Sequence, residues 1–420
     1  MLLAASAMAA LLAGCGGTAQ GGGSHQASSS SQKGSSQQTT EPTTNTNSVG
    51  RCADKGSTVG QQQEAGRGEA SNGKIAFVRR GADADHTDIY VMDEEATHET
   101  RLTRTPQAKE EGPVWSPDRK KIAFSLHWSV YVMDADGANK TRLTATPDYN
   151  FTFGSPVWSP DGRKLAFITQ RTPGGLTSYG ISVINADGTN RTQLQTKPFT
   201  PPDKSVGYGY YETTLLYGSL VWSPMGNKLA FGSYTKFESA SSADSSASAA
   251  YPVEGSSGIY LINVDGTGLC KLTGSHDEES FGMVPAWSPD GGKIAFQDQG
   301  MINVIDPDGS RRKEFAGTKG APSAPVWSPD GQKIAYFDSA NSGLYVINAD
   351  GSGREKLTVG VSALPQHAWS PDGQKIAFIC PGYGGDSSLC AINADGTERA
   401  RLARHISPSG YGAYAAWGSG

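Results

Sequence analysis

The sequence predicts an all-β protein: a seven-bladed β-propeller whose C-terminal strand closes the first blade, preceded by a signal peptide and a disordered linker. Three observations predict it. A phrase of the form Trp-Ser-Pro-Asp-Gly-x-Lys-Ile-Ala-Phe recurs along the chain, at the spacing of about 40 residues that is typical of propeller blades. Each repeat contains four short segments with the two-residue alternation of β-strands. Glycine and proline, which favour tight turns, account for 53 and 23 of the 420 residues.

The second repeat shows how each strand is recognised. We expect strands at 113–115, 121–125, 130–133 and 141–144, because apolar and polar residues alternate there between turn signals. Ser-Pro-Asp separates the first two strands, and Asp-Ala-Asp-Gly separates the last two. Proline fixes φ in such turns, aspartate bonds to nearby backbone N–H groups, and glycine allows positive φ.

The number of blades follows from comparing the repeats. Six of them begin with Trp-Ser-Pro, at Trp115, Trp158, Trp222, Trp287, Trp327 and Trp369. The second strand occurs seven times, at Phe77, Phe124, Phe167, Phe231, Phe296, Tyr336 and Phe378. The unit at 72–105 therefore lacks an inner strand, and residues 412–417 supply one. We expect the two to join, which removes open sheet edges; six complete blades with frayed ends is the alternative.

The repeated phrase resembles the WD40-like repeat of the TolB β-propeller family, also found in the propellers of prolyl-oligopeptidase-type enzymes. The resemblance covers residues 72–417. It implies a propeller fold and an extracytoplasmic location. TolB proteins have an α/β domain before a six-bladed propeller, whereas this sequence shows seven units and no such domain, so the resemblance implies no particular partner.

The N-terminal region predicts export and attachment to a membrane. Residues 1–15 form a short apolar run ending in Leu-Ala-Gly-Cys, which resembles a bacterial lipoprotein signal with Cys15 as the lipidation site. An ordinary secretory peptide is the alternative, and no Lys or Arg precedes the apolar run. Residues 16–70 are rich in Gly, Ser, Gln and Thr, and we expect a disordered tether with a reach of about 40 Å before the propeller at 71–420. The expected location is the bacterial cell envelope, outside the cytoplasm, with a lipid anchor in the membrane.

The remaining cysteines suit an oxidising compartment. Cys380 and Cys390 lie on adjacent predicted strands of the last blade, and we expect a disulfide between them. Cys52 and Cys270 either pair with each other or stay free.

The composition and motifs argue against several kinds of chemistry. A net charge of −5 does not suit a nucleic-acid groove. The Asn/Asp-x-Asp-Gly tetrads resemble the start of a calcium loop, but none has the glutamate that completes one, so we interpret them as hairpin turns. They are residues 134–137, 185–188, 263–266, 306–309, 348–351 and 393–396. No Gly-x-Ser-x-Gly nucleophile motif occurs, and we expect no cofactor and no metal.

We therefore favour a non-catalytic protein. The alternative is an extracytoplasmic lyase or lactonase with a metal in the central channel near His367, which replaces the usual residue two positions before the blade tryptophan. A single histidine is more often structural than a metal ligand.

The expected binding face is the one that carries the long connections. Connections from strand two to three and from strand four to the next blade are long and irregular at 79–88, 169–180, 197–217, 233–258 and 381–388, and such loops often carry function. The fourth blade has an aromatic segment whose candidate binding residues are Phe199, Tyr208, Tyr210, Tyr211 and Tyr217. An envelope protein or a glycan is the expected partner. Alternatively, these tyrosines close the channel mouth, and the Ser/Ala run at 239–250 is disordered.

Overall fold

The computed structural model describes residues 52, 73–81, 86–106, 108–144, 151–171, 178–194, 209–215, 220–239, 250–252, 258–273, 284–298, 300–315, 322–360, 367–382, 387–406 and 415–417. Every regular element in these segments is a β-strand. None of them forms a helix that is long and apolar enough to cross a membrane. The described part of the chain is therefore all-β, as the sequence predicts.

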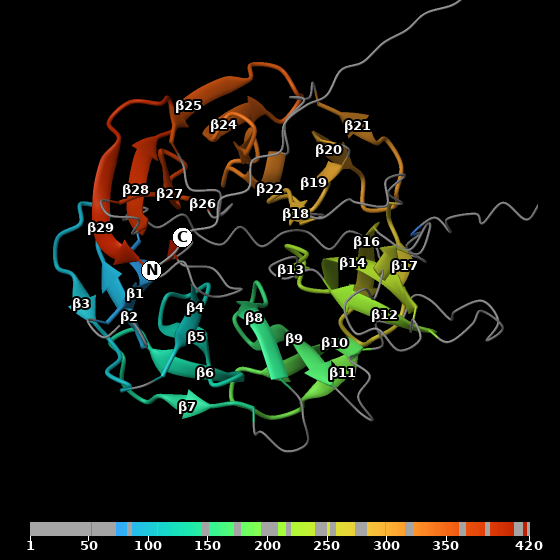
Figure 1. Ribbon diagram of the computed structural model, residues 1–420, viewed down its shortest axis with the longest axis horizontal. Coiled ribbons are helices and arrows are strands. Elements are labelled where there is room, and N and C mark those ends of the chain that lie inside the picture. The colour runs from blue at the N-terminus through green and yellow to red at the C-terminus, as the bar shows by residue number, and fades with distance from the viewer. Residues whose placement is uncertain are drawn as a thin grey trace, which may run out of the picture. The chain divides into compact units, whose positions relative to one another are not determined.

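The described strands form six hydrogen-bonded sheets, which follow one another in sequence order around a common centre (Figure 1). The largest sheet contains two groups of four strands, joined where Arg79 pairs with Ile406. We number the resulting strand groups as units one to seven. Unit one combines the last described strand with the first three. It contains β30 (Ala415–Trp417), β1 (Ile75–Arg80), β2 (Thr87–Met92) and β3 (Thr100–Arg101).

The other units follow the order of the sequence. Unit two contains β4 (Glu110–Trp115), β5 (Lys121–Leu126), β6 (Ser129–Asp134) and β7 (Thr141–Arg142). Unit three contains β8 (Phe151–Trp158), β9 (Lys164–Arg171), β10 (Ser178–Asn185) and β11 (Thr192–Leu194). Unit four contains β12 (Gly209–Leu215), β13 (Val221–Trp222), β14 (Lys228–Ser239), β15 (Ala250–Pro252), β16 (Gly258–Asn263) and β17 (Cys270–Lys271).

The last three units have four strands each. Unit five contains β18 (Ala286–Trp287), β19 (Ile294–Asp298), β20 (Met301–Ile305) and β21 (Lys313–Glu314). Unit six contains β22 (Pro322–Trp327), β23 (Lys333–Asp338), β24 (Gly343–Asn348) and β25 (Glu355–Val359). Unit seven contains β26 (His367–Trp369), β27 (Lys375–Pro381), β28 (Ser387–Asn393) and β29 (Ala400–Ile406).

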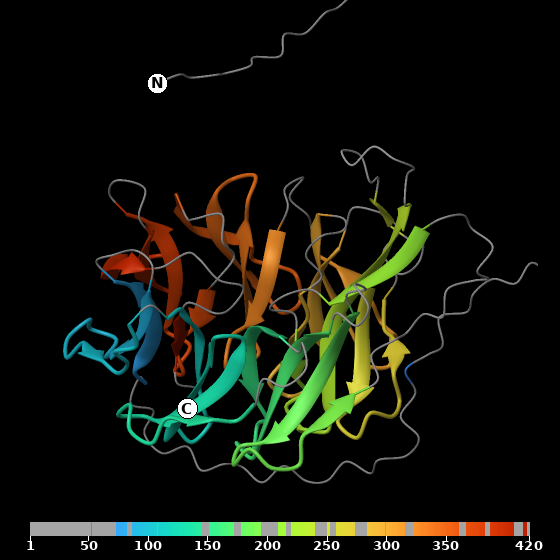
Figure 2. The same cartoon turned by 60° about the horizontal axis from the view of Figure 1, so that its bottom comes forward.

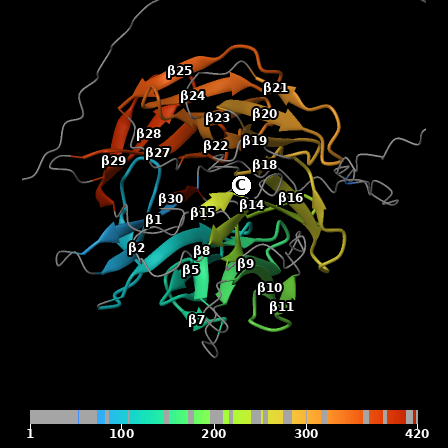
Figure 3. The ribbon, with the colours of Figure 1, turned by 45° about the vertical axis from the view of Figure 1, so that its right-hand side comes forward.

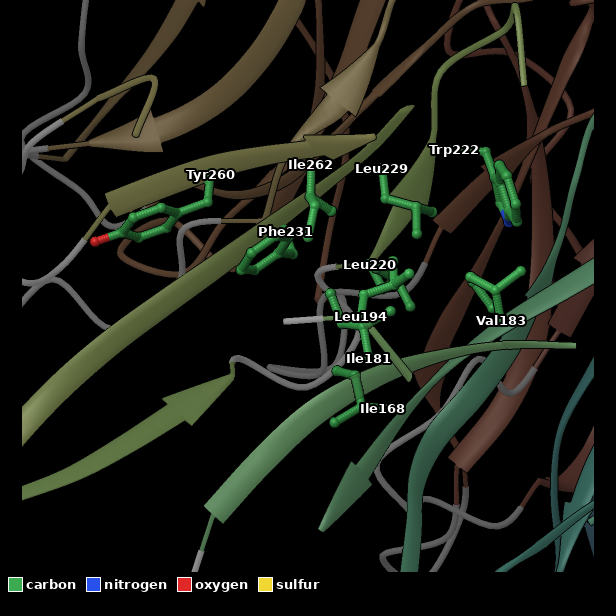
Figure 4. Close-up of a cluster of buried hydrophobic side chains, with 11 residues drawn as sticks. Ile168, Ile181, Val183, Leu194, Leu220, Trp222, Leu229, Phe231, Tyr260 and Ile262 are labelled. Carbon is green, nitrogen blue, oxygen red and sulfur yellow. The ribbon is translucent and has the colours of Figure 1, made fainter. Parts of the chain in front are cut away.

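The core lies between the units. A cluster of buried apolar side chains fills the space between each unit and the next, including the space between units seven and one. Figure 4 shows the cluster between units three and four, where Ile168 and Ile181 lie opposite Phe231 and Ile262. Because both faces of the second and third strands are covered, these strands are apolar almost throughout rather than alternating strictly.

The repeated phrase has a direct structural meaning at each position. In unit two, the Ser116 hydroxyl donates to Asp118 Oδ1 at 2.6 Å and accepts from the Lys121 N–H at 2.9 Å, which fixes the turn between the first two strands. The tryptophan links neighbouring units: Trp222 Nε1 donates to Val157 O of unit three at 3.0 Å. Trp158, Trp327 and Trp369 make the same bond to the unit before them.

The first and last described strands meet in unit one. β30 pairs antiparallel with β1, with Trp417 opposite Ile75 and Ala415 opposite Phe77. The Trp417 side chain is buried in the apolar cluster between units seven and one. Burial of so large a side chain contributes about 2–3 kcal/mol of hydrophobic free energy, so the C-terminal strand is a substantial part of this unit.

Two disulfides are present. Cys380 and Cys390 join β27 to β28 within unit seven, with their Cα atoms 5.9 Å apart. Cys52 bonds to Cys270 of β17, with Cα atoms 5.7 Å apart, and closes a covalent loop between residues that are 218 positions apart. Cys52 is buried against the cluster between units four and five. Cys52 lies within the expected tether, residues 16–70, and is the one residue of that range that the structure describes.

Candidate functional site

Unit four breaks the repeat by extending its sheet. Its second strand, β14, has 12 residues, whereas the second strands of the other units have five to eight. The first half of β14 pairs with β16, and the second half pairs with β12 on one side and β15 on the other. The views in Figures 2 and 3 show these strands in light green and yellow-green, with β15 labelled beside β14 in Figure 3. We call β12, β15 and residues 233–239 of β14 the unit-four extension.

The extension corrects the prediction that residues 197–217 and 233–258 are irregular loops. Residues 209–215 and 233–239 instead form paired strands, in which Tyr211 stands opposite Phe237 and Thr213 opposite Thr235. Aromatic and β-branched residues favour extended backbone, and cross-strand pairs of the same kind stabilise antiparallel strands. The prolines and the Ser/Ala run around these segments hid this signal in the sequence.

The predicted binding residues fall partly on this extension. Tyr210 and Tyr211 lie in β12, where they stand opposite Glu238 and Phe237 of β14. Phe199, Tyr208 and Tyr217 lie outside the described residues, and so does the predicted lipidation site Cys15. The two tyrosines are therefore placed on a strand at the side of the sheet where strand two leads into strand three.

A second unusual feature occupies the same side in unit two. The turn between β5 and β6 consists of His127 and Trp128, with φ angles of 48° and 62°. Two-residue turns with positive φ at both positions strongly favour Asn and Gly, and such backbone costs roughly 1–2 kcal/mol for each other residue. The Trp128 side chain is nonetheless 50% exposed. Backbone strain combined with an exposed tryptophan is more typical of recognition than of folding. The repeat pattern of the sequence does not mark this turn.

His367 is held as a neutral, structural histidine. Its Nε2 lies 3.1 Å from Ala335 O, to which the neutral ring donates a hydrogen bond. Burial lowers the pKa of His367 from 6.5 to about 4, and the bond to the carbonyl opposes that change. Because Nε2 carries the donated proton, only Nδ1 could offer a lone pair to a metal. Among the residues that the structure describes, no three His, Cys, Asp or Glu side chains gather into a metal site.

The Asp-Gly tetrads act as turns. In unit six, Asp350 Oδ1 accepts hydrogen bonds from the Ser352 hydroxyl at 2.6 Å and from its N–H at 2.8 Å, and these bonds lower the pKa of Asp350. Asp187, Asp265 and Asp395 bond in the same way to the threonine two residues later. Each carboxylate is thus occupied within its own turn, as the hairpin interpretation requires.

The outer edge of unit four differs from the other units beside the Cys52–Cys270 disulfide. In units three, five and seven, the residue directly before the outer strand is an arginine that stacks on the aromatic ring of strand two: Arg191 over Phe167, Arg312 over Phe296 and Arg399 over Phe378, each at 5.5 Å. Unit four has Leu269 at the corresponding position, directly before Cys270. Leu269 packs on the cluster between units three and four, whereas Cys52 is buried against the cluster between units four and five.

Comparison with known proteins agrees with this architecture. Residues 260–414 match the family model of the TolB beta propeller domain. The chain is TolB-like over this region. No curated protein sequence matches the chain significantly.

Solved structures resemble this chain at low sequence identity. TolB from Acinetobacter baumannii is 18% identical, with a TM-score of 0.47, and the match covers 83% of this chain and 67% of that one. An oligogalacturonate lyase in complex with manganese is 17% identical, with a TM-score of 0.57, covering 81% and 87% of the two chains. A puromycin-hydrolysing peptidase from Mycobacterium tuberculosis is 14% identical, with a TM-score of 0.53, covering 80% of this chain and 54% of its own length. At these identities the likeness concerns the fold.

Proposed function

We propose that this protein is a surface-tethered, non-catalytic β-propeller of the bacterial cell envelope that binds an envelope protein or glycan through the unit-four extension. The observation that carries the proposal is the 12-residue strand β14 and its two additional partners, β12 and β15. Unit four alone combines these additions among the described strands. A repeat protein needs such a departure to have one distinguishable site, because near-identical turns around the ring offer none.

The scaffold in this proposal is a closed ring of seven blades. Units one to seven would each be one blade, and the C-terminal strand β30 would complete the first blade beside β1. Support comes from the apolar cluster that joins units seven and one in the same way as every other neighbouring pair. A closed ring leaves no long sheet edge exposed to aggregation.

The tether in this proposal begins at Cys15, the proposed lipid-anchored residue, outside the cytoplasm. The Cys52–Cys270 disulfide supports a defined exit point, because it holds the chain at β17 of unit four. The proposed tether is residues 16–70, and its Cys52 is bonded to unit four. The membrane attachment and the unit-four extension would thus share one unit, which fixes how the extension is presented.

A binding measurement tests the proposal. Replacing Tyr208, Tyr210 and Tyr211 together by Ala should weaken binding to a partner captured from the native envelope by at least about 2 kcal/mol if these are dominant contact residues. The melting temperature should change little, since the strands are held mainly by backbone pairing. A matched triple variant in the Asp-Gly turns of Asp187, Asp265 and Asp350 serves as the control. Unchanged affinity in the tyrosine variant, with loss of binding in the turn variant, would place the site on the opposite face.

A propeller enzyme is the second candidate, and the fold likeness to the oligogalacturonate lyase with manganese favours it. The described residues do not fit a metal centre of that kind, because His367 is the one candidate and its Nε2 bonds to Ala335 O. Metal analysis of the purified, dialysed protein separates the two candidates. Stoichiometric bound manganese or zinc, lost in His367→Ala, would support the enzyme.

A further inference from the structure

Three aromatic residues lie in one row across the three strands of the unit-four extension. Tyr211 of β12 stands opposite Phe237 of β14, and Phe237 stands opposite Tyr251 of β15. Directly opposite residues lie on the same face of a sheet, and neighbouring strands are about 4.8 Å apart. The three residues therefore form a continuous line of aromatic positions, which we call the aromatic row.

The two faces of the extension differ in charge. Successive residues of a strand alternate between its faces, so the face of the aromatic row also carries Gly209, Thr213 and Leu215 of β12 and Ser233, Thr235 and Ser239 of β14. None of these residues is charged. The charged residues of the three strands lie on the opposite face, and they are Glu212, Lys236 and Glu238. Tyr210 lies on that opposite face too, where it stands opposite Glu238.

The aromatic row lies beyond the level at which the strands of the neighbouring units end. Phe231 of β14 corresponds in the repeat to Phe167 of β9 and to Phe296 of β19. Phe237 comes six residues after Phe231, whereas β9 ends four residues after Phe167 and β19 ends two residues after Phe296. Because a strand rises about 3.3 Å per residue, the row lies about 7 Å past the end of β9. On this face of β14 the described core residues are Leu229 and Phe231, so the row continues the same face past the core.

The row is fixed to the body of unit four through β14. This strand runs without interruption from the core into the extension, over Lys228–Ser239. On the side of unit three, β12 also contacts β10. A sheet anchored in this way holds its aromatic positions in a preset geometry, and preset geometry lowers the entropic cost of binding.

We propose that the aromatic row binds a linear, uncharged, β-1,4-linked glycan, with successive sugar rings stacked on Tyr211, Phe237 and Tyr251. The flat faces of such sugars present C–H hydrogens, which are attracted to the electron-rich faces of aromatic rings. The threonine and serine hydroxyls on the same face can donate to and accept from sugar hydroxyls.

The charge distribution decides between the kinds of ligand. A face without charged residues suits a neutral glycan better than an anionic one, and better than a protein surface, because protein interfaces are enriched in arginine. A β-1,4-linked chain is straight and can follow a straight row, whereas an α-1,4-linked chain curves away from it. This inference rests on the binding role proposed for the unit-four extension and names the ligand class.

Four oligosaccharides of equal length test the proposal by isothermal titration calorimetry on the full chain. Cellohexaose and chitohexaose are neutral and β-1,4-linked, maltohexaose is neutral and α-1,4-linked, and hexagalacturonate is anionic. We expect saturable binding of at least one of the two β-linked probes, little dependence of that binding on salt, and weaker binding of the other two sugars. Absence of binding by both β-linked probes, equal binding of maltohexaose, or tighter binding of hexagalacturonate would each overturn the proposal.

Variants locate the binding on one face of the sheet. Tyr211→Ala and Tyr251→Ala should each weaken binding of the β-linked probe by about tenfold, as expected for an aromatic contact residue, whereas Tyr211→Phe keeps the ring and should bind like the parent. Tyr234→Ala is the matched control, since Tyr234 stands opposite Thr214 on the other face of the same strands. Circular dichroism and the melting temperature show whether each variant is folded. Equal weakening in Tyr234→Ala and Tyr211→Ala, or none in either row variant, would show that the row is not the site.

A fluorescent variant keeps the proposal testable if an alanine variant does not fold. Tyr211→Trp retains an aromatic ring at the row, so it should bind the β-linked probe and its added emission should change as the probe is titrated. Bound probe without any change in that emission would place the glycan elsewhere.

The glycan inference and the proposed function can fail separately. If neither β-linked probe binds, but an envelope component captured by the parent is lost from the Tyr208, Tyr210 and Tyr211 triple variant, only the glycan inference is wrong. If neither probe binds and that component is retained by the triple variant, both are wrong.

Discussion

Pro117 of unit two lies against Gly162 of unit three, so that a β-carbon on Gly162 would stand 3.6 Å from Pro117 Cδ. Gly162 has φ of +68°, a conformation that residues with a side chain rarely adopt. Four further Ser-Pro turns lie against the next unit in this way, through the pairs Pro160–Gly226, Pro224–Gly291, Pro289–Gly331 and Pro329–Gly373, at 3.5 to 3.7 Å. In unit two the glycine is replaced by Arg119, with φ of 59°. In unit one, Gly418 and Ser419 follow Trp417 where the other repeats have Ser-Pro, so the repeat supplies no proline from the preceding unit for Arg119.

This relationship predicts that glycine and arginine are not interchangeable at the positive-φ position of the Ser-Pro turns. Gly331→Arg should destabilise the protein by roughly 1–2 kcal/mol through backbone strain alone, and by more where the side chain meets Pro289. Arg119→Gly should be neutral or stabilising by up to about 1 kcal/mol, because it relieves the positive φ without losing a contact to a proline. Urea unfolding of both variants measures the difference. Equal effects at the two positions would contradict the role assigned to the proline.

Removal of the C-terminal strand tests the proposed closed ring. Deleting residues 410–420 removes Trp417 from the cluster between units seven and one and leaves β1 without its inner neighbour. We expect a broad unfolding transition and aggregation through the exposed edge. Deletion of residues 418–420 alone, which keeps Trp417, is the control. Calorimetry that shows the longer deletion melting as sharply and as high as the control would mean that β30 does not close the first blade.

The two disulfides should differ in their contribution to stability. The Cys52–Cys270 pair closes a loop of 218 residues, and Cys380–Cys390 closes one of ten. On the chain-entropy account, the longer loop contributes about 5 kcal/mol and the shorter about 3 kcal/mol. Non-reducing peptide mapping should first show both linked pairs in the exported protein. Guanidinium unfolding of the two double-serine variants then compares them, and a smaller loss for the Cys52/Cys270 variant would contradict the ordering.

Stability should decrease as the pH falls from about 6.5 to about 4, because folding lowers the pKa of His367 from 6.5 to about 4. In this interval the unfolded chain binds a proton at His367 that the folded protein does not, so the free energy of unfolding falls by at most about 3 kcal/mol. Burial raises the pKa of Glu110, which acts in the opposite sense but equally in all variants.

His367→Gln removes this titration while keeping a side-chain N–H for Ala335 O. The variant should lose less stability than the parent between neutral pH and about pH 4, measured by urea unfolding at both values. His127→Gln is the matched control, since His127 is exposed. If both variants follow the parent curve, His367 is not a source of the pH dependence.

The repeat made most of the strands predictable, because its residues act locally. The Ser-Pro-Asp turn bonds within itself, as Ser116 and Asp118 show, and the tryptophans meet the unit before them. The unit-four extension was not predictable, since the strands at β12 and β15 are held by pairing with β14 and lie beside proline- and serine-rich segments without clear alternation. The Cys52–Cys270 bond was equally undecided, because sequence spacing does not show which distant residues meet.

Site-specific photo-cross-linking in the native envelope tests the central claim most directly. A photoreactive phenylalanine analogue is placed at Tyr211 on the unit-four extension, at Trp128 in the strained turn on the same side, and at Asp350 in a turn of the opposite side. The account predicts that Tyr211 cross-links to one envelope component, that Trp128 cross-links to the same component or to none, and that Asp350 does not cross-link to it. Cross-linking at Asp350 with none at Tyr211 would contradict recognition through the unit-four extension.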